Sequence, residues 1–162
     1  MHSYFWLTSS PTKSSIPEDV PYTTEALKQD LNRIRSAWEE CQASRDRDAI
    51  YDYLGAVFNL IDWWKVDNDA LTRSHRALRV HNPLPFEQEN PFAAIIRCTA
   101  DSAKVDKRAR SKWSRVLRYA WEYKPLDEPL QRFILRKGGI NKCASRFSKR
   151  LGRSAPPSHS CK

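Results

Sequence analysis

The residues with the clearest chemical potential in this sequence are cations in its C-terminal third. Between residues 104 and 153 there are 16 Lys or Arg against four Asp or Glu, a net charge of +12. The whole chain of 162 residues carries +9, so the remainder is mildly acidic, at −3. Cations gathered without opposing acids neutralise phosphates and release counterions, which gives affinity without base specificity. The asymmetry therefore predicts a polyanionic partner, with nucleic acid as the first choice.

Helical periodicity divides these cations between two predicted helices, over residues 106–123 and 140–151. Each helix has apolar residues at spacings of three and four and basic residues on another face. The residues expected to contact nucleic acid are Lys107, Arg108, Lys112, Arg115, Arg118, Lys137, Lys142, Arg146, Lys149, Arg150 and Arg153. Tyr119 and Trp121 lie off the apolar stripe of the first helix, so they are candidates for stacking on unpaired bases.

The basic segment 130–151 has the length of a helix-turn-helix unit, with two short helices joined by a glycine turn. Acids and a proline at residues 127–129 are typical of a helix start, and the glycines at 138–139 of a helix end. In this interpretation residues 130–137 form the supporting helix and residues 141–150 enter a DNA groove. An ordinary antiparallel helix hairpin fits the same pattern equally well.

The run GGINKCASRFSKRLG resembles the glycine-led first helix of the DNA-binding motif in Fis-type domains. Gly138, Gly139, Ala144 and Gly152 match that pattern, whereas Cys143 stands where the family has a small residue. The resemblance implies a recognition helix after Gly152, but the chain continues there with Arg153 and then SAPPSHSCK. We therefore assign no family on this run.

The composition favours an all-α fold. Only four Gly are present and β-branched residues are sparse, while six each of Trp, Tyr and Phe can build a core. Further apolar stripes predict helices over about 24–41, 46–64 and 67–81, and Pro91 favours a helix over a strand for 91–99. We expect six to seven helices in a small bundle that includes the basic C-terminal pair.

Composition also suggests how the chain is organised. Residues 1–22, rich in Ser and Pro, are expected to form an extended or partly disordered arm. Residues 23–100 form an N-terminal helical portion, which shares one core with the basic helical portion over residues 101–153. Residues 154–162 are expected to be a disordered tail.

Few residues suit catalysis or metal binding. The GxSxG, P-loop, HExxH and GxGxxG motifs are all missing from the sequence. The four cysteines are too widely spaced for a zinc site, so we expect reduced thiols. His75 alone on a helix is typical of a structural residue. We expect no enzymatic activity, no catalytic residue, no metal and no cofactor.

The opening run MHSYFWLTSS lacks the positive region and the apolar run of a signal peptide. The sequence has no stretch approaching the ~20 apolar residues of a membrane span. We therefore expect a cytoplasmic protein without a membrane partner, associated with the nucleoid if it binds DNA.

Together these features predict a non-catalytic nucleic-acid-binding protein, with DNA preferred, that acts through a basic helical face as a regulator or accessory factor. The alternative is a small interaction or inhibitor protein that binds an acidic surface or a nucleic-acid-binding complex. A homodimer is compatible with both. Its candidate seam is the stripe Leu27, Leu31, Ile34, Trp38 and Cys41, although the core is the favoured place for such a stripe. The charge pattern does not distinguish DNA from RNA as the ligand, nor a single strand from a duplex.

Overall fold

The computed structural model describes residues 24–65, 70–81 and 90–154, which contain seven α-helices and no β-strand. The helices are α1 (Thr24–Ala43), α2 (Ala49–Lys65), α3 (Ala70–His81), α4 (Pro91–Thr99), α5 (Lys107–Tyr123), α6 (Leu130–Arg136) and α7 (Ile140–Ser154). The prediction of a small all-α bundle is confirmed. The expected arm over 1–22 and all but the first residue of the expected tail lie outside the described residues.

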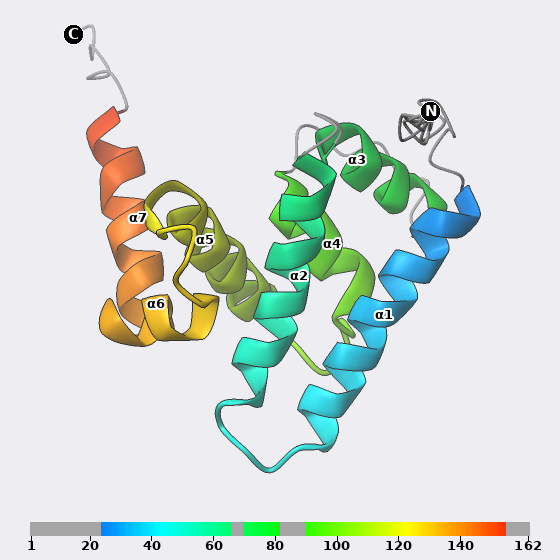
Figure 1. Ribbon diagram of the computed structural model, residues 1–162, viewed down its shortest axis with the longest axis horizontal. Helices are drawn as coiled ribbons and strands as arrows, with labels where there is room; N and C mark the ends of the chain where they lie inside the picture. The colour runs from blue at the N-terminus through cyan, green and yellow to red at the C-terminus, as the bar shows by residue number, and fades with distance from the viewer. Residues whose placement is uncertain (1–23, 66–69, 82–89, 155–162) are drawn as a thin grey trace, which may run out of the picture.

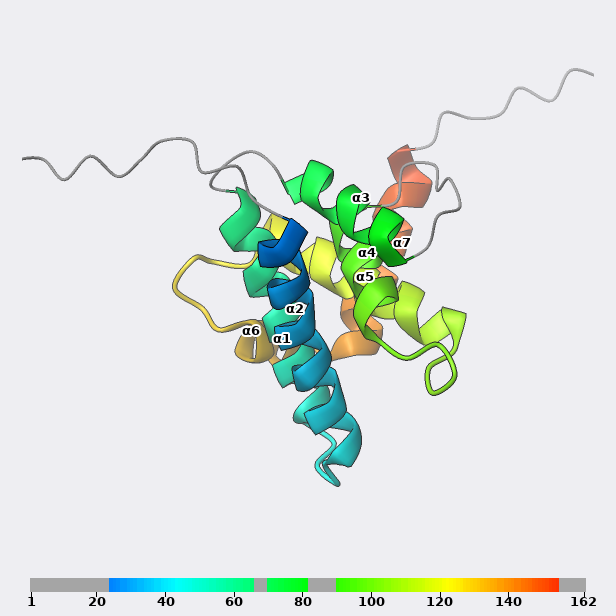
Figure 2. The ribbon, with the colours of Figure 1, turned by 90° about the vertical axis from the view of Figure 1, so that its right-hand side faces the viewer.

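The helices are arranged so that α1 and α7 lie at opposite ends of the molecule, with α2, α4 and α5 between them (Figure 1). In the perpendicular view α4 lies between α3 and α5, and it packs against both (Figure 2). The helix α7 packs along α5, and α6 contacts α2, α5 and α7. The basic C-terminal helices therefore rest on the N-terminal ones through α5 and α6.

The two helices that meet at the candidate site have side-chain caps at their N-termini. Asn90 Oδ1 accepts a hydrogen bond from the Ala93 amide at 3.0 Å, and Pro91 occupies the first turn of α4. Asp106 Oδ1 accepts from the Ala109 amide at 2.7 Å at the start of α5. Each cap satisfies a backbone donor that the helix itself cannot use. These caps fix where both helices begin, and the segment 91–99 is a helix as expected.

A single hydrophobic core includes side chains from all seven helices. Near its centre, Trp38 of α1, Tyr53 of α2 and Trp113 of α5 pack with ring centroids 5.1 to 6.1 Å apart. The Tyr53 hydroxyl lies 2.8 Å from Thr99 Oγ1, and burial raises the pKa of Tyr53. Each aromatic pair of this kind contributes about 0.5–1.5 kcal/mol beyond its buried area. These contacts hold the N-terminal half of α5 against α1 and α2.

The stripe of α1 that was a candidate dimer seam faces this core. Leu27, Leu31, Ile34 and Trp38 are each at most 5% exposed within the single chain, and Cys41 packs against the core while half-buried. The apolar face of α1 is therefore buried within the molecule, which is the usual place for a stripe with this helical spacing.

The turn between α6 and α7 depends on two glycines. Gly138 and Gly139 have φ values of +94° and +90°, a conformation that other residues adopt at a cost. A Cβ at Gly138 would lie 2.6 Å from Cδ of Lys142. The amide of Gly139 donates to the Ile134 carbonyl at 2.8 Å and closes the end of α6. The predicted glycine stop at this position is confirmed.

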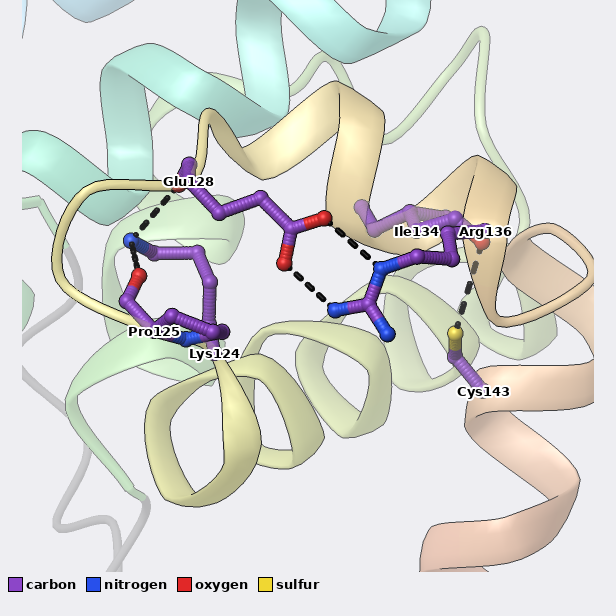
Figure 3. Close-up of polar contacts among 6 residues, drawn as sticks. All are labelled: Lys124, Pro125, Glu128, Ile134, Arg136 and Cys143. Carbon is purple, nitrogen blue, oxygen red and sulfur yellow. Dashed lines mark hydrogen bonds and ion pairs between the residues drawn. The ribbon is translucent and has the colours of Figure 1, made fainter.

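The start of α6 differs from the expectation for residues 127–129. The helix begins at Leu130, and Pro129 takes the cap position without a side-chain hydrogen bond. The carboxylate of Glu128 instead accepts two hydrogen bonds from Arg136, Nε to Oε1 at 2.8 Å and Nη2 to Oε2 at 2.5 Å (Figure 3). This bidentate pair joins the loop before α6 to the end of the same helix.

The same loop is held from its other side by Lys124. Its Nζ donates to the carbonyl of Pro125 at 2.9 Å and to that of Glu128 at 3.0 Å (Figure 3). The Pro125 carbonyl also accepts from the Glu128 amide at 3.3 Å, so Lys124 adds to a turn that the backbone already closes.

We expect the Glu128–Arg136 pair to make stability depend on pH. Arg136, which donates to the carboxylate, holds the pKa of Glu128 below its ordinary value. Such a group stabilises the fold above its unfolded pKa of about 4.3, and this stabilisation is lost as the pH falls through the lower folded value. The free energy of unfolding should therefore fall less between neutral and acid pH in Glu128→Gln than in the wild type. Urea denaturation at both pH values measures this, and equal losses in the two proteins would contradict it.

Candidate nucleic-acid interface

A groove of about 610 Å³ runs between α4, α5 and the C-terminal part of α7, and the charged residues that line it within the described part of the chain are all cations. The lining consists of Asn90, Ala93, Arg97, Lys107, Arg110, Ser111, Ser114, Arg115, Arg118 and Leu151. We call it the basic groove. Five of these side chains carry a positive charge, and the remaining polar ones can donate hydrogen bonds. This set suits an anion with several oxygen acceptors, such as a phosphodiester chain.

The α5 part of the lining follows directly from helical spacing. Its members are Lys107, Arg110, Ser111, Ser114, Arg115 and Arg118, which recur every three or four residues and so form one stripe. Val116, Leu117 and Ala120 of the same helix are fully buried in the core. Packing of the apolar stripe thus turns the basic stripe toward the space beside α4.

Two of the groove cations, Arg97 and Arg110, are missing from the set predicted by sequence. Arg110 is half-buried, and its Nε has no hydrogen-bond partner among the described residues. Its position three residues after Lys107 is the signal that could have revealed it, because it places both on one stripe. Arg97 is the only charged residue of α4, and an isolated cation in an apolar helix is a weaker signal.

Arg115 and Arg118 are held at the groove by α7. Arg115 Nη1 donates to Ser148 Oγ at 2.6 Å, and Ser148 donates in turn to the Ala144 carbonyl at 3.0 Å. The guanidinium of Arg118 lies 4.6 Å from the ring centroid of Phe147, and its partial burial lowers its pKa. Guanidinium groups fixed in this way lose little conformational entropy when they bind an anion.

The eleven cations predicted by sequence do not share one surface, because only Lys107, Arg115 and Arg118 line the basic groove. A second group is exposed along α7 at spacings of four, three and four, opposite the buried Cys143 and Phe147. It consists of Lys142, Arg146, Lys149 and Arg153, and we call it the outer row.

The remaining predicted cations belong neither to the basic groove nor to the outer row. Lys137 lies 5.8 Å over the Phe133 ring, and its carbonyl accepts a hydrogen bond from Arg146 Nη1 at 2.8 Å. Arg150 pairs with Glu122 and donates to the Tyr123 hydroxyl at 2.5 Å, so it joins α7 to the end of α5. Two further predicted cations, exposed Arg108 and half-buried Lys112, lie on α5 outside the groove lining.

The two candidate stacking residues differ in their surroundings. Tyr119 is half-buried, with its ring centroid 4.8 Å from that of Tyr123 and 5.9 Å from that of Phe133. Trp121 is also half-buried, and it lines a second cavity that adjoins the basic groove. Geometry therefore favours Trp121 over Tyr119 as a residue that can reach a ligand in the groove.

The described residues contain no cluster of three or more His, Cys, Asp or Glu side chains that could hold a metal ion. In the same ranges every helix is too short or too polar to span a bilayer. Cys41, Cys98 and Cys143 are free thiols, and burial raises the pKa of Cys143.

Comparison of the chain with protein-family models, with curated proteins and with solved structures gave no match to any of them.

Proposed function

We propose that this chain is a non-catalytic nucleic-acid-binding protein, with DNA preferred, that holds backbone phosphates in the basic groove. The observation that carries the proposal is the composition of the groove lining, which among the described residues has five cations from two helices and no carboxylate. A nucleic-acid strand offers one negative charge per nucleotide, so several of these cations can bind one continuous ligand. Contacts of this kind give affinity and leave the base sequence unread.

The alternative of a merely solvated charged surface fits the groove less well. Such surfaces usually intersperse both signs of charge, which lowers the mutual repulsion of the cations. Here the like charges of Lys107 and Arg110 converge on one concave space, and the buried Nε of Arg110 adds a donor without an acceptor among the described residues. A bound polyanion would offset the repulsion and supply that acceptor.

The helix-turn-helix interpretation leads to a different surface of the molecule. If α7 entered a DNA groove as a recognition helix, the outer row would carry the contact, because it is the exposed face of that helix. We prefer the basic groove because its arginines are oriented by neighbouring side chains, as seen for Arg115 and Arg118. The outer row would then add long-range attraction to the same polyanion.

Fluorescence anisotropy with labelled probes tests this function. The probes are a DNA strand of about 20 nucleotides, its duplex and the corresponding RNA, at about 50 mM salt to keep phosphate contacts strong. Saturable binding to at least one probe, in the micromolar range or tighter, is the expected result. If the protein bound none of the three probes, the proposal would be overturned. Equal competition by polyglutamate of matched charge would also count against it and favour the interaction-protein alternative.

A further inference from the structure

A second cavity of about 220 Å³ adjoins the basic groove, and its lining is mainly apolar. The residues that line it are Ile61, Lys65, Asn90, Pro91, Phe92, Arg118, Trp121 and Glu122. We call it the aromatic pocket. Asn90 and Arg118 line both the pocket and the basic groove, so the two spaces are direct neighbours. A ligand with an apolar part and an adjacent anionic part could occupy both at once.

The indole of Trp121 is fixed in the wall of this pocket by two other rings. Its centroid lies 5.6 Å from that of Phe58 and 5.5 Å from that of Phe92, and both contacts are edge-to-face. Lys65 Nζ lies 4.6 Å from the centroid of the same indole, and the Lys65 side chain is exposed. The pocket therefore presents a rigid aromatic surface covered by one movable cation.

We propose that the aromatic pocket receives one unpaired base of a strand whose phosphates lie in the basic groove, an inference that rests on the proposed function. Base stacking on an aromatic ring is generally stronger than an exposed cation–π contact, so the base can displace Lys65 from the Trp121 ring. The displaced ammonium then lies beside the ligand, where it can bind a base carbonyl or a flanking phosphate.

The polar residues at the junction fit this ligand. Oδ1 of Asn90 is engaged by the amide of Ala93 and the hydroxyl of Ser114, so its amide nitrogen is the atom that can donate to a ligand. Arg118 can bind the phosphate that follows the base, because it lines both spaces. The carboxylate of Glu122 pairs with Arg150, which offsets its negative charge.

An unpaired base is a better occupant than a base within a duplex. In a duplex the bases are stacked and paired, and extruding one of them costs free energy that a single strand does not spend. A neutral apolar ligand would leave the adjoining cations unused. The pocket and the groove together therefore favour single-stranded nucleic acid over a duplex of the same sequence.

The direct test compares two single strands of equal length and charge, one of thymidines and one of abasic residues, by anisotropy with the full chain. The wild-type protein should bind the thymidine strand about tenfold more tightly, because only that strand can stack. Equal affinities would overturn the pocket assignment and leave the proposed function standing. Failure to bind either strand would also overturn the pocket assignment, and it would overturn the proposed function only if the duplex and RNA probes failed to bind as well.

Variants of Trp121 test whether the preference for the thymidine strand arises in the aromatic pocket. Trp121→Leu keeps an apolar side chain without a stacking surface, so the preference for thymidines should disappear. Trp121→Phe keeps an aromatic ring and should retain most of the preference for the thymidine strand. Trp63→Leu removes an indole that is 55% exposed and lies outside the pocket lining, so it should leave the preference unchanged. A preference that survives Trp121→Leu would show that the base binds elsewhere, and circular dichroism verifies that each variant is folded.

Discussion

Replacing Lys107 and Arg110 together by Glu is expected to weaken nucleic-acid binding by about 100-fold at physiological salt. Each side chain is expected to donate one hydrogen bond to a phosphate, worth about 1.5 kcal/mol, and 1.4 kcal/mol corresponds to a factor of ten. Lys107 is exposed, and the Nε of Arg110 has no hydrogen-bond partner among the described residues, so the fold should persist. Fluorescence anisotropy gives the affinities, and circular dichroism checks the fold.

The matched control is Lys142→Glu with Lys149→Glu, which changes the net charge of the chain by the same amount. Both lysines are exposed in the outer row on α7 and lie outside the basic groove. Because the total charge is equal in the two double variants, a difference between them reports the location of the contact. We expect the control to lose less than about tenfold. A loss as large as that of the groove variant would favour α7 as the recognition helix.

Replacing Phe147 by Ala is expected to lower the free energy of unfolding by about 3–5 kcal/mol. Phe147 is 2% exposed, and the guanidinium of Arg118 lies 4.6 Å from its ring centroid. Domains typically have only about 5–15 kcal/mol of stability, so the loss is a large share of the total. Urea denaturation followed by circular dichroism measures it.

Phe147→Leu is the corresponding control, because leucine fills most of the same space and should cost less than about 1.5 kcal/mol. An unchanged urea midpoint in Phe147→Ala would contradict the conclusion that α7 is part of the core. Because Phe147 also supports Arg118, the folded fraction of Phe147→Ala should bind nucleic acid more weakly than Phe147→Leu does.

The helices could be predicted because their signals are local. Leu27, Leu31, Ile34 and Trp38 recur at helical spacing and are all buried, and proline and glycine mark the ends of α4 and α6. The role of Glu128 could not be predicted in this way. Its partner Arg136 lies eight residues further on and approaches it only through the geometry of the loop before α6.

The candidate site could be predicted in part, for a related reason. The periodicity of α5 and α7 gives the basic faces, but the sequence does not say which cations meet after packing. Arg97 joins the basic groove only because α4 packs beside α5. Arg150, which the sequence also predicts as a contact residue, lies outside the groove lining, where Glu122, 28 residues away, pairs with it. Long-range packing decides both cases, and no spacing within a single helix encodes it.

The salt dependence of binding by the unchanged protein tests most directly whether the basic groove neutralises phosphates. If its five cations each release one counterion, raising the salt from about 50 to about 200 mM should weaken binding by about 100-fold for a single strand and about 500-fold for a duplex. An affinity that stays the same across this interval would contradict phosphate binding in the groove.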